Sequence, residues 1–147
     1  MPNTRSAHDL VTIAGAIDPQ SAVGTTISSD WVDMSKWSLA LFVLSNGTID
    51  ATVDFKLVEA KDSIGTGSQD LSTRAIVQAP ATDDNKQYAI SVCDEHLTRS
   101  SGYRYVRSVV TIGAGTASIV SVVALGVAPK QLPAVDYKHA DVSQIIG

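Results

Sequence analysis

The sequence has little of what small disulfide-rich domains and nucleic-acid-binding proteins depend on. Its single cysteine, Cys93, excludes an intrachain disulfide framework, so a chain of 147 residues must be held together by an apolar core. Charged residues make up only 18% of the chain and the net charge is -4, which argues against a basic surface for nucleic acid. Residues 1–9 lack an apolar segment behind a basic cap, so we predict no secretory signal.

Residues that favour helices are also scarce. There are two glutamates, Glu59 and Glu95, and nine leucines, against 17 valines, 11 isoleucines and 12 threonines. Side chains branched at Cβ are stiff at χ1 and fit a pleated sheet better than a helix. The composition therefore predicts an all-β protein, and the length predicts one domain.

The longest uncharged run, residues 109–128, is long enough for a membrane-spanning helix. Glycines at 113 and 115 interrupt it, and half of its residues are branched at Cβ. We therefore predict no membrane span but a hairpin, with one strand ending at Ile112, a glycine turn, and a second strand over 117–127.

Turn signals at short spacing divide the chain into about eight strands, the pattern of an antiparallel β-sandwich of jelly-roll type. Residues 31–37 are compatible with either a polar turn or one helical turn. Residues 61–68 are predicted to form a loop. The predicted strands cover residues 8–17, 22–28, 38–45, 49–57, 75–79, 88–93, 103–112 and 117–127.

Three of these strands carry specific expectations. The first is predicted to end at Asp18-Pro19. The run 38–45 is apolar throughout, which predicts a strand buried on both faces. Asn46-Gly47 then predicts a tight hairpin turn. In the strand that follows, Val53, Phe55 and Leu57 alternate with polar residues, which predicts one buried and one solvated face.

The sandwich domain is assigned to residues 1–128 and an extended C-terminal arm to residues 129–147. The arm has no net charge, two prolines and scattered apolar residues, so it cannot form a core of its own. Either it frays, or it packs on a neighbouring subunit or partner. The apolar pair Ile145-Ile146 favours packing.

Catalytic, metal and cofactor motifs are missing from the sequence. His8, His96 and His139 are far apart, and no pair of ligands has the spacing of a metal site. Cys93 and His96 would point to opposite faces of a strand, which argues against a nucleophilic pair. Residues 83–85 are predicted to form a solvated turn and not a calcium loop. We predict a non-enzymatic protein without a cofactor.

Two arginines and two tryptophans are the candidate binding residues. Arg104 and Arg107 lie among aromatic residues and could stack on bases, pair with carboxylates on a neighbouring strand, or form an ion pair between subunits. Trp31 and Trp37 could line a sugar site, or anchor the core or a subunit contact.

The order of segments between residues 38 and 133 resembles that of small virion proteins of tailed bacteriophages. An amphipathic strand ends in the charged turn of residues 54–63, a strand with a Tyr-x-Arg-x-x-Val-Thr-like pattern covers 103–111, and a Val/Ala strand over 122–129 leads to a tail with prolines.

The resemblance implies a capsid decoration (cement) protein, a homotrimer that binds the major capsid protein on the outside of an assembled head. It would be made in the host cytoplasm and make no direct contact with nucleic acid. A head–tail connector, a tail component and a sugar-binding or receptor-binding sandwich remain as alternatives. The predicted partner-contact residues are Trp31, Trp37, Arg104, Arg107, Tyr137, Ile145 and Ile146.

Overall fold

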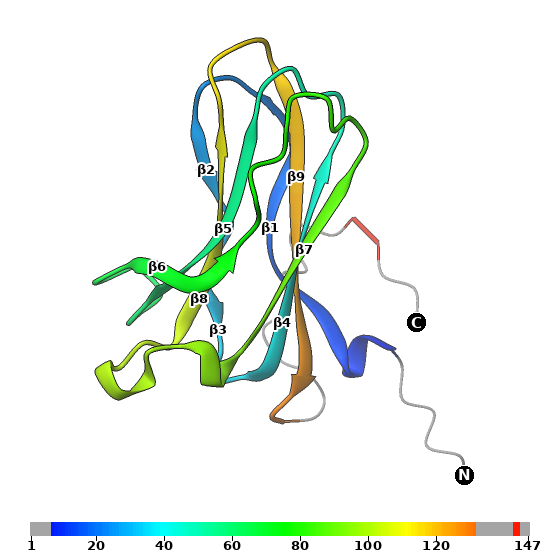
Figure 1. Cartoon of the computed structure of the whole chain (residues 1–147). Coiled ribbons are helices and arrows are strands. Elements are labelled where there is room, and N and C mark those ends of the chain that lie inside the picture. The colour runs from blue at the N-terminus through cyan, green and yellow to red at the C-terminus, as the bar shows by residue number, and fades with distance from the viewer. Residues whose placement is uncertain (1–6, 132–142, 145–147) are drawn as a thin grey trace.

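The computed structural model describes residues 7–131 and 143–144, and these form two packed β-sheets (Figure 1). Within that part of the chain, no helix is long and apolar enough to cross a membrane. The elements are η1 (Ala7–Asp9), β1 (Val11–Ala22), β2 (Thr26–Ser28), β3 (Val32–Asp33), β4 (Trp37–Asn46), β5 (Val53–Ala60), β6 (Gln69–Ala75), β7 (Gln87–Cys93), η2 (Asp94–His96), η3 (Arg99–Ser101), β8 (Tyr105–Ile112) and β9 (Ser118–Pro129), where η marks a 3₁₀ turn.

The strand order is that of a jelly roll. Sheet A has the order β1-β9-β4-β7, and sheet B has the order β2-β8-β5-β6, with β3 also paired to β8. When β2 and β3 are counted as two parts of one strand beside β8, eight antiparallel strands divide between the sheets as in a jelly roll. The predicted all-β, antiparallel sandwich of jelly-roll type is confirmed.

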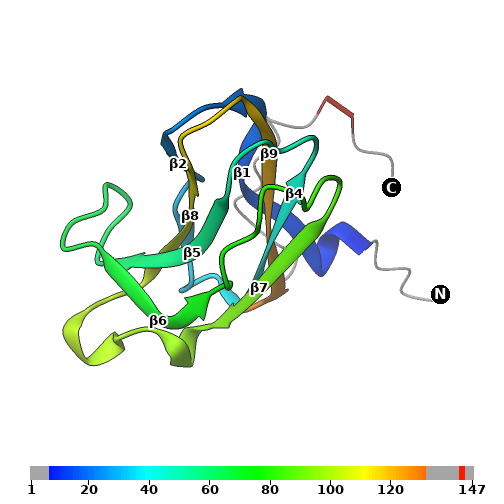
Figure 2. The same cartoon turned by 45° about the horizontal axis from the view of Figure 1, so that its top comes forward.

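The core lies between the two sheets, which face each other in Figure 2. Phe42 and Leu44 of β4 point inward from sheet A, and Phe55 and Leu57 of β5 point inward from sheet B. All four side chains are at most 1% exposed. The predicted alternation of β5 is correct, because Asp54 and Lys56 lie on its solvated side.

Both predicted hairpins are wrong, because each connection crosses from one sheet to the other. Asn46 ends β4 in sheet A, and the chain reaches sheet B before β5 begins at Val53. Asn46 and Gly47 are not among the residues with positive φ, which a tight turn of that type requires. Gly47 instead donates a backbone hydrogen bond to Ile119 of β9.

The uncharged run of residues 109–128 also divides between the sheets. It supplies the end of β8 to sheet B and most of β9 to sheet A, so these strands are not paired with each other. Gly113 donates to the carbonyl of Thr52 and accepts from Gly24, which holds the connection at the end of the sandwich. The local sequence identifies β8 and β9 as strands. The chain crosses from sheet B to sheet A between them because each strand packs its buried side chains into the same core.

Several strand boundaries also differ from the predictions: β2 begins at Thr26 and not at residue 22, and β5 begins at Val53 and not at residue 49. β1 continues past Asp18-Pro19 to Ala22, because a register shift between Ile17 and Gln20 accommodates the proline on an edge strand. The strand predicted over residues 75–79 lies earlier, at Gln69–Ala75, and only Ala79 forms an isolated bridge, to Val53.

Candidate interaction surfaces

The outer face of sheet A is apolar across its central strands. Residues that are paired across β1, β9 and β4 form rows on this face. One such row consists of Val11, Val127 and Leu39. No outward position in these rows carries a charge. We call this surface the sheet A face, and its members are Val11, Ile13, Ala16, Leu39, Leu41, Val43, Val123, Leu125 and Val127.

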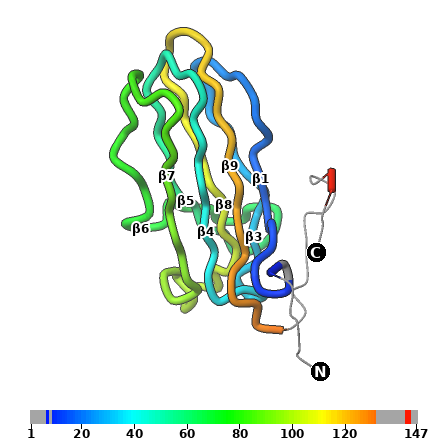
Figure 3. Tube along the Cα trace, turned by 90° about the vertical axis from the view of Figure 1, so that its right-hand side faces the viewer, coloured from blue at the N-terminus to red at the C-terminus, as the bar shows by residue number. Residues whose placement is uncertain are grey.

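This face is uncovered in the part of the chain that the structure describes. Figure 3 looks onto it, with β7, β4, β9 and β1 side by side toward the viewer. Leu39 is 44% exposed and Val123 38% exposed. The prediction that residues 38–45 are buried on both faces is therefore wrong for the single chain, since only Ala40, Phe42 and Leu44 point into the core.

Trp37 cannot be a surface contact, because it is 1% exposed. Its indole ring packs against Gly126 of β9, where an added Cβ would lie 2.5 Å from the ring. The prediction of Trp37 as a partner-contact residue is wrong, and so is a sugar site that pairs it with Trp31. The alternative reading of Trp37 as a core anchor is confirmed.

Trp31 and Arg107 contact each other on the outer side of sheet B. The guanidinium carbon of Arg107 lies 4.4 Å from the centre of the indole ring, a cation–π contact. Gly65 approaches the same ring so closely that an added Cβ would lie 3.1 Å from Cζ2, and its φ of +89° favours glycine. Trp31 is therefore half-buried and held in place, with one ring face occupied by Arg107.

The loop that carries Gly65 is organised by one carboxylate. Asp62 accepts backbone hydrogen bonds from Ile64 at 3.1 Å and from Thr66 at 2.9 Å. The hydrogen bonds from Thr66 lower the pKa of Asp62, so the carboxylate stays charged at neutral pH. The predicted loop over 61–68 is confirmed, and it forms a wall beside Trp31.

Arg104 forms an ion pair within the chain. Its Nε and Nη2 donate to the two oxygens of Asp33 at 2.7 and 2.6 Å, and Asp33 lies on the neighbouring strand β3. Burial alone would raise the pKa of Asp33, but hydrogen bonds from Arg104 and Ser35 lower it from 3.8 to about 2. The alternative in which Arg104 pairs with a carboxylate across strands is confirmed.

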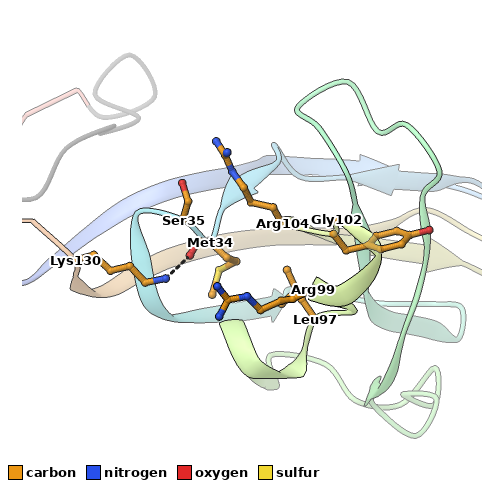
Figure 4. A pocket seen from close by; sticks show the side chains of 8 residues that line it. Met34, Ser35, Leu97, Arg99, Gly102, Arg104 and Lys130 are labelled. Atoms are coloured by element: carbon orange, nitrogen blue, oxygen red, sulfur yellow. Dashed lines mark hydrogen bonds between the residues drawn. The ribbon is translucent and has the colours of Figure 1, made fainter.

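A cavity of about 230 Å³ lies at the same end of the molecule (Figure 4). Arg99, Arg104 and Lys130 line it, which would suit an anion, but each cation already has a partner. Arg104 pairs with Asp33, while Arg99 and Lys130 both contact Asp94. Lys130 also donates to the carbonyl of Met34 at 3.1 Å. Asp33 and Asp94 offset two of the three positive charges and every one of these cations is paired, so the arrangement does not build an anion site.

Cys93 and His96 are in contact, contrary to the prediction. The chain leaves β7 at Cys93 and turns into η2, which brings Nδ1 of His96 to 3.3 Å from the sulfur. Arg74 contacts the same imidazole, with its Nη2 at 2.7 Å from Nε2 and 3.1 Å from Nδ1. A nucleophilic pair needs a group that stabilises the imidazolium, and a guanidinium disfavours it.

Two other acidic groups, Glu59 and Asp84, have structural roles. Glu59 is 1% exposed, and its oxygens accept from Gln69 at 2.6 Å and from the backbone of Thr98 at 2.8 Å. Asp84 accepts the backbone hydrogen bond of Ile49 at 2.7 Å, which fixes the predicted turn of residues 83–85. Across residues 7–131 and 143–144, no cluster of three or more potential ligands could hold a metal ion.

Three predicted contact residues, Tyr137, Ile145 and Ile146, lie outside the described residues. Among the described ones, Trp31, Arg104 and Arg107 are accessible at least in part, whereas Trp37 is not. The sheet A face was missed, although a signal was present. In the run of residues 38–45 the side chains of both faces are mostly apolar, and those of the outer face have no partner among the described residues.

Comparison with known proteins assigns no family to this chain. No protein-family model and no curated protein sequence matches this chain. A Triatoma virus structure is similar with a TM-score of 0.44 and 8% identity, covering 92% of this chain and 73% of the other. The xylan-binding domain CBM22-2 of Paenibacillus barcinonensis Xyn10C has a TM-score of 0.37 and 8% identity, covering 75% and 86%.

A third similar structure is that of T=1 particles derived from infectious bursal virus. Its TM-score is 0.28 and its identity 11%, covering 84% of this chain and 42% of the other. At these TM-scores and identities, the three similarities support no conclusion about this chain.

Proposed function

We propose that this chain is a structural virion protein that binds the outside of an assembled icosahedral head and cements neighbouring major capsid subunits. The observation that carries the proposal is the uncharged sheet A face. Monomeric soluble proteins rarely expose a contiguous apolar surface larger than a few hundred Å², and larger ones mark protein–protein contacts. We therefore expect a protein with such a face to bind other protein subunits.

Two further features support a role in a virion. Jelly rolls recur in viral capsid domains and in lectins, so the fold by itself is compatible with both. The resemblance of residues 38–133 to small virion proteins of tailed phages favours the first. Against a lectin-like role, Trp37 is buried and Arg107 covers one face of Trp31, which leaves no pair of open rings for a sugar.

In this proposal the chain binds and does not catalyse. It is made in the host cytoplasm, forms a homo-oligomer such as a trimer, and contacts the outer capsid surface with its C-terminal arm. The arm adds contact area on the capsid. Its apolar side chains include Tyr137, Ile145 and Ile146.

The test is sedimentation of the purified chain with empty heads of its source phage. We expect the intact chain to pellet with the heads. Deletion of residues 132–147 should weaken binding at least about tenfold while the circular dichroism spectrum remains that of a folded sandwich. The deletion begins after Gln131 because Lys130 bonds to the body of the domain at Lys36 and Met34.

A matched pair of variants separates the apolar arm from its length. Substituting Tyr137, Ile145 and Ile146 by alanine should reproduce the loss, whereas Lys138→Ala with Gln144→Ala should not. An intact chain that stays in the supernatant would refute the cement proposal. A truncated chain that binds with unchanged affinity would refute the role of the arm.

A further inference from the structure

We propose that Arg107 and Lys61, on the outer side of sheet B, bind carboxylates in an acidic segment of a partner protein. Their surface lies on the sheet opposite the sheet A face and gives the chain a second contact. The inference goes beyond the proposed function and is tested without heads. Three observations support it: the unpaired donors of Arg107, the aromatic rings that hold both cations, and the charges around them.

The side chain of Arg107 has no hydrogen-bond partner in the part of the chain that the structure describes. Its Nε is buried without an acceptor. Buried polar groups in native proteins nearly always have a partner. A guanidinium presents its N–H donors as a planar fork, which fits a carboxylate through two parallel hydrogen bonds. The unpaired donors of Arg107 therefore favour an acceptor that another molecule supplies.

Trp31 holds Arg107 in position. Trp31 lies one residue before β3, which pairs with β8, and the guanidinium carbon is 4.4 Å from the centre of its ring. Gly65 closes against the same ring, where an added Cβ would lie 3.1 Å from Cζ2. Stacking uses the flat face of the guanidinium and leaves the donors at its edge for an acceptor. A side chain that is already held in position loses little freedom on binding.

Lys61 is held by a second aromatic ring beside the same loop. Its Nζ lies 5.4 Å from the centre of the Tyr103 ring, and the Tyr103 hydroxyl donates to the carbonyl of Gly67 at 2.8 Å. The loop of residues 61–68 thus contacts both rings on which the two cations lie, through Gly65 and Gly67. Trp, Tyr and Arg are also the residue types enriched at the centres of protein–protein interfaces.

The nearby carboxylates are engaged elsewhere. Asp33 accepts two hydrogen bonds from Arg104, and Asp70 pairs with Lys56 at 2.7 Å. Asp62 accepts backbone hydrogen bonds from its own loop. None of these three carboxylates is paired with either cation of the proposed site. A carboxylate from a partner would supply the missing counter-charge.

An acidic protein segment fits this surface better than a nucleic acid does. Binding of nucleic acid depends on a basic surface that neutralises several phosphates. The chain has a net charge of -4, so a long polyanion would be repelled by the rest of the molecule. A short segment can contact the two cations alone.

The test is a titration of the isotope-labelled full chain with a hexaglutamate peptide at low salt, followed by amide chemical shifts. We expect shifts that centre on residues 61–68 and 104–107 and that saturate with a dissociation constant on the order of 1 mM. Added salt should weaken the binding, because it screens ion pairs at the surface. A hexaglutamine peptide, which carries no side-chain charge, should cause no such shifts.

Three variants locate the site. Arg107→Met removes the charge but keeps an unbranched side chain, and it should raise the dissociation constant at least about tenfold. Lys61→Met should raise it about threefold, because an ammonium lacks the planar fork. The matched control is Lys86→Met, which removes one positive charge at an exposed position just before β7 and should leave the titration unchanged.

Arg107→Lys covers the case in which the loss of Arg107 disturbs Trp31. This variant keeps the charge, so it should bind more weakly than the intact chain but more tightly than Arg107→Met. The inference is overturned if hexaglutamate causes no shifts near Arg107, or if Lys86→Met weakens binding as much as Arg107→Met. A hexathymidylate oligonucleotide that binds there more tightly than the peptide would also overturn it. None of these outcomes depends on whether the chain binds heads.

Discussion

At Trp37 and Gly126, the size of one residue limits its neighbour. The indole ring lies where a side chain at position 126 would begin, so only glycine fits there. We expect Gly126→Ala to lower the free energy of unfolding by about 2 kcal/mol, because the ring or the strand must shift in a close-packed core. Urea unfolding followed by Trp fluorescence measures this. Val77→Ala, at a residue 91% exposed, is the control and should change stability by less than about 0.5 kcal/mol. An equally stable Gly126→Ala would mean that the contact is loose.

The Asp33–Arg104 ion pair gives stability a specific pH dependence. The pKa of Asp33 is about 2 in the folded chain against an ordinary value of 3.8. A lowered folded pKa contributes stability above the unfolded pKa, and the contribution disappears as pH falls through the folded pKa. We expect the pair to stabilise the chain fully above about pH 4 and to lose its effect between about pH 4 and 2.

The measurement is urea unfolding across that pH range for the intact chain and for Asp33→Asn. The variant should be less stable at neutral pH and should show a shallower decline below pH 4. Asp70→Asn is a suitable control, since Asp70 pairs with Lys56 at a site where the two side chains are 67% and 40% exposed. If Asp33→Asn and the intact chain decline in parallel, the pair does not contribute.

At the scale of elements, one hydrogen bond joins two loops at an end of the sandwich. Asp84 accepts from the backbone nitrogen of Ile49, in the crossover between β4 and β5. Asp84→Ala should cost about 1 kcal/mol of unfolding free energy, because it removes the acceptor of a partly buried donor. The thermal midpoint measures the loss, with Asp70→Ala as the exposed control. An unchanged midpoint would show that water replaces the carboxylate.

At the scale of the whole molecule, the two sheets present different outer faces. Sheet B carries Lys56, Asp70, Arg107 and Trp31, whose polar groups contact each other or water. Sheet A carries the uncharged rows. Under the proposed function, this difference favours an orientation in which the sheet A face is turned toward the partner. This asymmetry connects the fold to the proposed structural role.

The sequence alone determined the class of fold and most strands. Branched side chains and turn residues act locally, so β7 and β8 were identified near their observed bounds. The strand that became β5 was placed three to four residues too early, but its alternation gave the buried face. Arg104 and Trp31 were predicted as contact residues, and both are accessible at least in part.

The tertiary structure decided which strands share a sheet. A tight turn and a crossover begin with similar residues, and only the common core of Phe42 and Phe55 puts β4 and β5 in opposite sheets. The same packing buried Trp37 against Gly126 and brought His96 to Cys93. It also left the outer side chains of β4 and β9 uncovered, because the apolar pattern of a strand records that both faces are buried but does not record by what.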